Sequence, residues 1–251
     1  MDEILAALED QQAELDGLIT PVVGDSWALA SRCEGWTVSD VVLHLAQTNE
    51  MAIGSLTGTF NETLERLTAG LRPSEDVDDG AGLIVDNERG APPDAVFERW
   101  THSVEQMMGA YRAADPHDRV QWVAGTLSVH TLATTRLAET WIHTNDVAFG
   151  LGVALDPPAR LEHIARLAWR TLPYAFARAG REMKGTVDFD LVGTTGAPWR
   201  FAHAEPSPTV VRGAAAELCA VAGQRANAAN TGLTAEGPDA ADVLELVRTF
   251  A

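Results

Sequence analysis

The spacing of apolar residues changes near residue 180, and this change limits the folds open to the chain. Before that point apolar residues recur every three to four positions, as on the buried face of a helix. After Gly185 the segment TVDFDLV (186–192) alternates with a period of two, which is typical of a half-buried strand. We therefore expect an α + α/β protein, with a helical domain at 1–180 and a small α/β domain at 181–251.

The helical part is expected to form a four-helix bundle with up to five helices, at 2–18, 37–57, 92–114, 129–149 and 159–179. Thr37 is the expected N-cap of the second helix, and Asp40 can complete a capping box. Gly150 and Gly152 are expected to end the fourth helix. The acidic, turn-rich segment 71–90 is expected to be a long connection. In the second domain we expect strands at 186–192, 199–204, 209–212 and 231–235, and helices at 214–222 and 239–250.

Charge and composition exclude several classes of function. Of the 251 residues 46% are hydrophobic, which predicts a globular protein, and no apolar run approaches the roughly 20 residues of a membrane span. A net charge of −18 argues against nucleic acid and anionic membrane surfaces as partners. The acidic N-terminus lacks the basic region of a signal peptide. Two distant cysteines, Cys33 and Cys219, predict no disulfide framework and favour the reducing cytoplasm.

A glutamate followed four residues later by a histidine occurs twice, and helical phase separates the two pairs. Glu98 and His102 fall opposite the apolar side of their helix. We expect them to form a solvated pair of the kind that stabilises a helix by about 0.2–0.5 kcal/mol.

The second pair, Glu139 and His143, belongs to a polar stripe that also contains Arg136 and Asp146. The helix that carries this stripe is apolar nearly all round, which predicts that it is buried. A buried charge needs a partner. Either an internal ion-pair network that includes Arg136 satisfies the stripe, or a divalent metal ion does.

A metal site requires a third ligand, and His44 in VSDVVLHLAQ (38–47) is the candidate. As an isolated residue it would be a packed core histidine. Together with Glu139 and His143 it gives two histidines and one glutamate, a set that leaves an open position in catalytic zinc sites. Cys33 is expected to be a small buried residue rather than a nucleophile.

Two segments resemble the signature segments of the mycothiol-dependent maleylpyruvate isomerase family, DinB-like metalloproteins of actinobacteria: CEGWTVSDVVLHLAQ (33–47) and TRLAETWIHTNDVAFGLG (135–152). The resemblance implies a bundle that holds a divalent metal, expected to be Zn²⁺, through His44, Glu139 and His143. It also implies a sterol-carrier-like α/β C-terminal domain. Relatives usually have Cys-Pro-Gly-Trp at 33–36, so Glu34 predicts a less rigid turn.

The resemblance further implies that the open metal position takes the thiolate of mycothiol, a low-molecular-weight thiol. A cation deprotonates a coordinated thiol, and the thiolate could add to a small electrophile. This predicts a metal- and thiol-dependent isomerase or S-transferase. Two alternatives remain: a hydrolase that uses metal-bound hydroxide, and a non-catalytic protein that binds metal or another ligand.

Residues around the expected ligands have alternative roles. Arg136 and Asp146 either orient Glu139 and His143 or serve only as helix-stabilising charges. In the second domain several side chains could meet carboxylates of the thiol or the substrate, although each alone is also an ordinary surface residue: Arg200, His203, Arg212 and Arg225.

Overall fold

The computed structural model describes residues 1–249 and divides into two compact units, Met1–Leu155 and Asp156–Ala251. The boundary precedes the one expected near residue 180. The reason is that helix α7 (Leu161–Arg178) packs within the second unit. Its Trp169 donates an indole hydrogen bond of 2.7 Å to the carbonyl of Val187 and stacks against the ring of Phe201.

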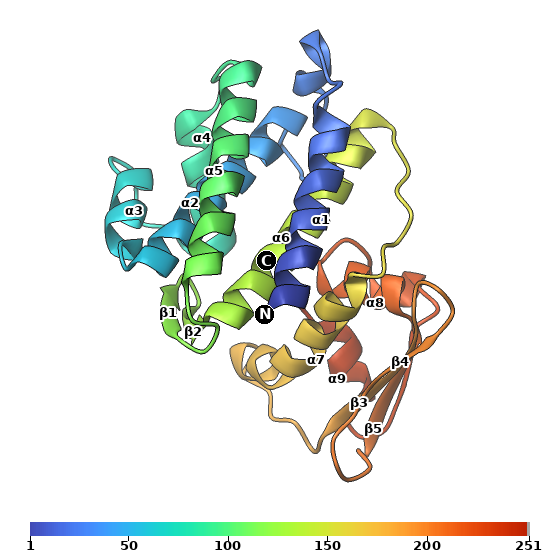
Figure 1. Cartoon of the computed structure of the whole chain (residues 1–251). Helices are drawn as coiled ribbons and strands as arrows, with labels where there is room; N and C mark the ends of the chain where they lie inside the picture. The colour runs from blue at the N-terminus through green and yellow to red at the C-terminus, as the bar shows by residue number, and fades with distance from the viewer. Residues whose placement is uncertain (250–251) are drawn as a thin grey trace. The chain divides into compact units, whose positions relative to one another are not determined.

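Four long helices form the bundle of the first unit: α1 (Asp2–Ile19), α2 (Val38–Thr57), α5 (Pro93–Ala113) and α6 (Val129–Leu151). Helix α2 contacts both α5 and α6, while α1 contacts α6 (Figure 1). Apolar residues at helical spacing meet in the core between them, among them Leu15, Val41, Leu45, Trp100 and Val147. The expected four-helix bundle is thereby confirmed.

The ends of α2 and α6 follow the sequence signals closely. Thr37 caps α2, and its side chain and that of Asp40 form the expected capping box. Gly152 ends α6 in the left-handed conformation with φ of 70°, a geometry that favours glycine. Gly150, expected to help end α6, instead lies inside it, where a side chain would meet the carbonyl of Ala30 at 2.8 Å.

Shorter elements complete the first unit: η1 (Gly24–Ala28), α3 (Phe60–Leu67), α4 (Val77–Glu88), β1 (Arg119–Trp122) and β2 (Gly125–Ser128). The expectation of a connection throughout 71–90 was wrong, because α4 occupies much of it. The side chain of Asp76 accepts a hydrogen bond from the amide of Asp79 and caps this helix. Ile84 and Val85 anchor it in the core.

The second unit contains a mixed four-stranded sheet in the order β4-β3-β5-β6 (Figure 1). Its strands are β3 (Val187–Val192), β4 (Pro198–Phe201), β5 (Thr209–Ala214) and β6 (Thr234–Glu236). Strands β3 and β5 are parallel and the other pairs antiparallel. Besides α7, the unit has α8 (Ala215–Ala222), η2 (Ala228–Asn230) and α9 (Ala240–Leu246). The expected α/β texture is confirmed, but α9 ends before the predicted Phe250, which lies outside the described residues.

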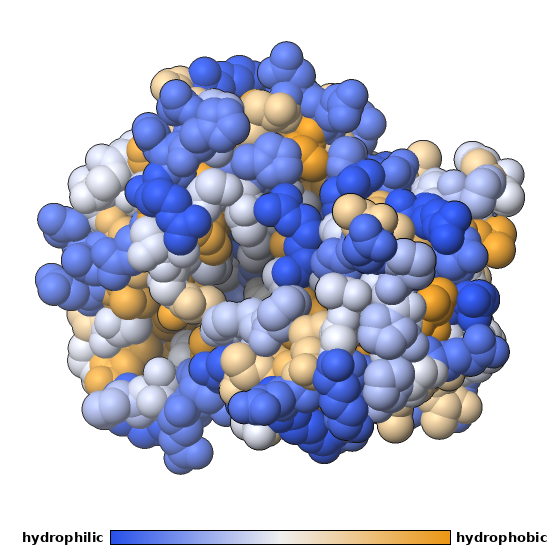
Figure 2. All heavy atoms as spheres, turned by 90° about the horizontal axis from the view of Figure 1, so that it is seen from below, coloured by the Kyte–Doolittle hydropathy of each residue, from blue (hydrophilic) through white to orange (hydrophobic). Residues whose placement is uncertain are grey.

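The surface of the protein carries many polar side chains. The face drawn in Figure 2 is mostly hydrophilic, with apolar residues scattered among the polar ones. Within residues 1–249, none of the helices combines the length and hydropathy needed to cross a membrane.

Candidate metal centre

The polar stripe of α6 faces the interior of the first unit, as its helical phase predicts. Arg136 and Asp146 are fully buried, and Glu139 and His143 are 6% and 7% exposed. The other sides of the helix are also largely buried, by apolar residues and by threonines, so the partners of the stripe come from within the bundle.

His44 reaches this stripe from α2. Its Nε2 atom lies 3.1 Å from Oε1 of Glu139, and its ring meets that of His143 edge-on at a centroid distance of 4.9 Å. The ligand atoms of His44, Glu139 and His143 all lie within 4.8 Å of one another, and all three residues are buried. The structure thus brings together the three residues that the sequence singled out.

Glu139 and His143 each have a further hydrogen-bond partner outside this cluster. Nδ1 of His143 lies 3.0 Å from Oδ2 of Asp146, and Nη1 of Arg136 donates to Oε2 of Glu139 at 2.5 Å. Carboxylate partners of this kind fix the orientation of ligating histidines. Two imidazoles and one carboxylate fit a divalent ion with an open position, and Asp146 and Arg136 fix the orientation of two of these three groups.

The electrostatics keep His44 neutral and Glu139 ionised, the forms in which they can bind a metal. Burial lowers the pKa of His44, more than the hydrogen bond to Glu139 raises it. Burial alone would raise the pKa of Glu139, but the charge of Arg136 and the hydrogen bond with His44 outweigh it and hold that pKa far below its usual range. The result is a neutral imidazole beside an ionised carboxylate.

A hydrogen-bond chain behind Arg136 includes a residue that sequence reasoning missed. Nη2 of Arg136 donates to Oδ1 of Asn49 at 3.0 Å, and Nδ2 of Asn49 donates to the hydroxyl of Ser103 at 3.0 Å. Asn49 is fully buried. The available signal was an amide side chain within the apolar sequence of α2.

Cys33, predicted to be a small buried residue, is only partly buried and lies beside the cluster. Its Sγ donates to Oδ2 of Asp146 at 3.1 Å and lies 3.8 Å from Nδ1 of His143. The turn that carries it closes through a hydrogen bond of 3.1 Å from the amide of Trp36 to the carbonyl of Cys33. Gly35 in this turn has φ of 77°.

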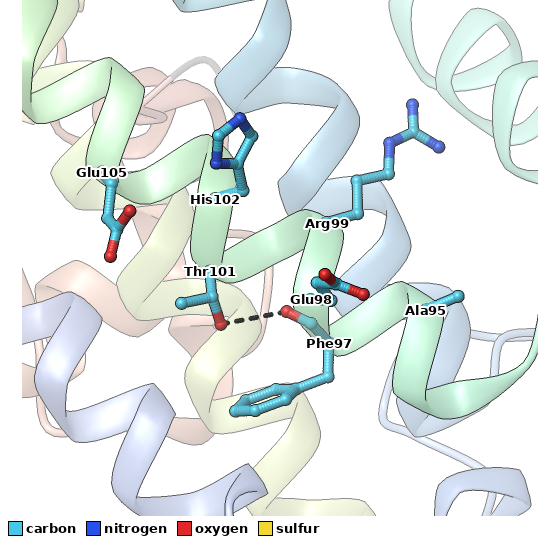
Figure 3. Close-up of a pocket in the computed structure, with 7 residues that line it drawn as sticks. All are labelled: Ala95, Phe97, Glu98, Arg99, Thr101, His102 and Glu105. Carbon is cyan, nitrogen blue, oxygen red and sulfur yellow. Dashed lines mark hydrogen bonds between the residues drawn. The ribbon is translucent and has the colours of Figure 1, made fainter.

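The other glutamate–histidine pair lies on the exposed face of α5, as predicted. Figure 3 shows Glu98 and His102 with their neighbours along a shallow surface hollow, where the hydroxyl of Thr101 donates to the carbonyl of Phe97. Both residues are exposed. Glu98 and His102 have the same spacing as Glu139 and His143, but both are exposed. Among residues 1–249 no third ligand atom completes a metal-binding group with them.

The predicted contact residues of the second unit lie on its surface or in turns. Arg212 donates to Glu236 at 3.0 Å, and Arg225 donates to the carbonyl of Gly223 at 3.1 Å. The exposed ring of His203 packs against Trp169, with ring centroids 5.1 Å apart, and Arg200 is exposed. Their contact with carboxylates of a ligand stays a prediction.

Comparison with known proteins gives matches across both units. The model of the mycothiol maleylpyruvate isomerase N-terminal domain matches residues 8–148. Uncharacterized proteins from two strains of Mycobacterium tuberculosis, CDC 1551 / Oshkosh and H37Rv, are each 27% identical over 98% of this chain and 95% of their own length.

Two crystal structures have a similar fold. They are a mycothiol-dependent maleylpyruvate isomerase and a histidine-to-alanine mutant of that enzyme, with TM-scores of 0.61 and 0.60. Each is 20% identical to this chain, and the match covers 94% of this chain and 95% of the other. At this identity the likeness concerns the fold.

Proposed function

Because the chain belongs to the family of the mycothiol maleylpyruvate isomerase N-terminal domain, we propose that it is a metal- and mycothiol-dependent enzyme. It would isomerise a small electrophilic substrate or transfer the thiol to it. The observation that carries this proposal is the buried convergence of His44, Glu139 and His143, backed by Arg136 and Asp146.

The three convergent residues would hold the ion, expected to be Zn²⁺. A divalent ion with an open position acts as a Lewis acid that deprotonates a coordinated thiol near neutral pH. Nδ1 of His143 lies 3.0 Å from Oδ2 of Asp146, and a proton donated from Nδ1 to this carboxylate would leave the lone pair of Nε2 to hold the ion. Arg136 fixes Oε2 of Glu139 and so directs Oε1 toward His44.

The charges of the surrounding side chains favour an anionic ligand. Glu139 and Asp146 contribute two negative charges and Arg136 one positive charge, so the three leave one net negative charge. They therefore do not balance a divalent cation by themselves, and in a buried site an uncompensated charge is costly. A thiolate completes the balance, whereas a neutral ligand does not.

A thiolate held there can attack an electrophilic double bond, forming a carbon–sulfur bond while the double-bond electrons move to the neighbouring carbon. If the bond rotates and the thiolate then leaves, the double bond re-forms and the result is isomerisation. If the sulfur stays and the neighbouring carbon takes up a proton from solvent, the result is S-transfer. We propose that Arg212 and Arg225 bind carboxylates of thiol or substrate. The free thiols of Cys33 and Cys219 fit the cytoplasm, where we place the protein.

Purification without chelator, followed by elemental analysis, tests the metal. We expect about one ion per chain after zinc is supplied. Substoichiometric metal would mean that the cluster is only a buried ion-pair network. The metal-loaded protein is then assayed with maleylpyruvate and a panel of small electrophiles, with and without mycothiol. Turnover only with mycothiol supports the proposal. Turnover without it favours the hydrolase, and none on any electrophile favours a binding protein.

A further inference from the structure

We propose that Cys33, His143 and Asp146 form a second metal site, selective for thiophilic divalent ions such as Cd²⁺ or excess Zn²⁺. The three ligand atoms, one sulfur, one nitrogen and one carboxylate oxygen, lie within 4.8 Å of one another. This set shares only His143 with the His44 cluster, and it uses the Nδ1 atom of that ring, which lies 3.8 Å from Sγ of Cys33.

The distances between the donors fit a single ion. Sγ of Cys33 lies 3.1 Å from Oδ2 of Asp146 and 3.8 Å from Nδ1 of His143, and these last two atoms lie 3.0 Å apart. Zinc–ligand bonds of about 2.0–2.3 Å at tetrahedral angles place donor atoms about 3.3–3.6 Å apart. Each observed distance is within a few tenths of an ångström of that range, so small side-chain movements complete the site.

The chemistry of the donors selects the metal. A thiolate is a soft ligand that favours zinc and its heavier relatives over magnesium or calcium. On binding, the S–H bond of Cys33 breaks, a sulfur–metal bond forms and the proton passes to solvent. The Cys33 thiolate and the Asp146 carboxylate then supply two negative charges, which match a divalent ion without any external anion.

The two sites exclude each other through the ring of His143. A neutral imidazole has one nitrogen with a free lone pair and one that carries a proton. An ion at Cys33 requires the lone pair on Nδ1, whereas an ion at His44 and Glu139 requires it on Nε2, with Nδ1–H bound to Asp146. One chain therefore holds one ion at a time. This competition rests on the proposed function, but the Cys33 site itself does not.

Cys33 is also the most accessible donor of the two clusters. It is half-buried, while His44, Glu139, His143 and Asp146 are buried. Its neighbours Arg32, Glu34 and Gly35 are exposed, so we expect an ion that arrives from solvent to meet Cys33 first. An ion retained at Cys33 occupies Nδ1 of His143 and so prevents metal binding at the His44 site. Excess thiophilic metal would therefore inhibit the enzyme.

Cadmium titration of the full-length, metal-free protein tests the site, because a cadmium–thiolate bond has a charge-transfer band in the ultraviolet. We expect His44→Ala, which lacks only the first site, to develop this band and to saturate at one equivalent. The band should disappear in His44→Ala/Cys33→Ala and persist in His44→Ala/Cys219→Ala, since Cys219 is buried elsewhere. Circular dichroism confirms that each variant is folded.

A folded His44→Ala variant without the band, or a band that survives removal of Cys33, overturns the proposal. Two cadmium ions per wild-type chain would overturn the mutual exclusion. Failure of the proposed function gives a different result: mycothiol-dependent turnover is then absent while the cadmium band is unaffected. Conversely, turnover with mycothiol and no band in His44→Ala removes only the Cys33 site.

Discussion

Nε2 of His44 lies 3.1 Å from Oε1 of Glu139, although 95 residues separate them along the chain. The contact joins α2 to α6 through two buried side chains. Burial lowers the pKa of His44, while the charge of Arg136 helps to hold that of Glu139 low despite burial. A neutral imidazole thus lies against an ionised carboxylate, and we propose that these two side chains bind the same divalent cation.

Removal of His44 should abolish high-affinity zinc binding. His44→Ala takes away one of three donors, so we expect the affinity to fall by more than the about 10–100-fold typical of losing an outer partner. His102→Ala is the matched control, because His102 also follows a glutamate at four residues but lies on the exposed face of α5. Competition with a metal-sensitive dye measures the zinc affinity of both variants. Equal losses would contradict the assignment of the site.

Arg136→Met should destabilise the metal-free protein strongly. The guanidinium is fully buried and paired with Glu139, and removing one partner of a buried pair costs about 3–5 kcal/mol of unfolding free energy. Urea denaturation measures this loss. Arg136→Met/Glu139→Gln should lose less than the two single variants together, because no uncompensated charge remains.

Zinc should stabilise Arg136→Met more than it stabilises the wild type, since the ion replaces the lost positive charge beside Glu139. The same denaturation series with zinc added tests this. An equal gain in both proteins would mean that the ion does not bind next to that carboxylate.

Asp146→Asn should weaken zinc binding by about 10–100-fold while the fold is retained. The amide still fills the space, but it no longer offers a charged acceptor to Nδ1–H of His143 at 3.0 Å. Isothermal titration of the metal-free protein measures the affinity. Asp190→Asn, an exposed change on β3, should leave it unaltered. An unaltered affinity in Asp146→Asn would reduce Asp146 to a structural charge.

The convergence of the three candidate ligands could be predicted because local signals were strong. The Thr37 capping box fixes where α2 begins and hence the phase of His44. The all-round apolar character of α6 predicts that Glu139 and His143 face inward. Their role as metal ligands stays a prediction.

What the sequence could not predict depends on long-range contacts. The approach of Cys33 to Asp146 accompanies contacts between its loop and α6, more than a hundred residues away along the chain: the amide of Arg32 donates to the carbonyl of Asp146 at 3.2 Å, and the 30–31 backbone packs closely on Gly150. The role of Asn49 depends on its hydrogen bond with Arg136, which lies on another helix. The acidic residues and glycines of α4 predict a turn from the sequence, but the segment forms a helix that buries Ile84 and Val85 in the core.

Acid should remove a stabilising contribution of Glu50. Burial alone would raise the pKa of this carboxylate, but hydrogen bonds from Arg99 and Arg66 lower it below 4.5. The folded state therefore binds the proton less readily than the unfolded state, so the contribution is present above pH 4.5 and is lost as the pH falls through the folded-state pKa.

Accordingly, Glu50→Gln should cost about 1–2 kcal/mol of unfolding free energy at neutral pH. The difference from wild type should shrink as the pH is lowered below 4.5. Urea midpoints over a pH series measure it. The exposed Glu98→Gln serves as control and should change stability by about 0.5 kcal/mol or less at every pH.

Gly150→Ala and Gly109→Ala should have opposite effects, although both glycines lie inside long helices. A Cβ at Gly150 would meet the carbonyl of Ala30 at 2.8 Å and Val38 at 3.1 Å, so the loop that carries Cys33 must move. We expect a loss of about 1–3 kcal/mol. A Cβ at Gly109 meets no atom within 4 Å, and reduced freedom of the unfolded chain should stabilise that variant by about 0.4–1 kcal/mol.

Thermal and urea unfolding of the two variants decide this prediction. If the displaced loop is also what sets Cys33 against Asp146, the cadmium band should weaken in His44→Ala/Gly150→Ala and keep its full height in His44→Ala/Gly109→Ala. Stabilisation by Gly150→Ala would show that the 30–31 backbone yields without cost. The close packing of that backbone on α6 would then not hold Cys33 beside Asp146.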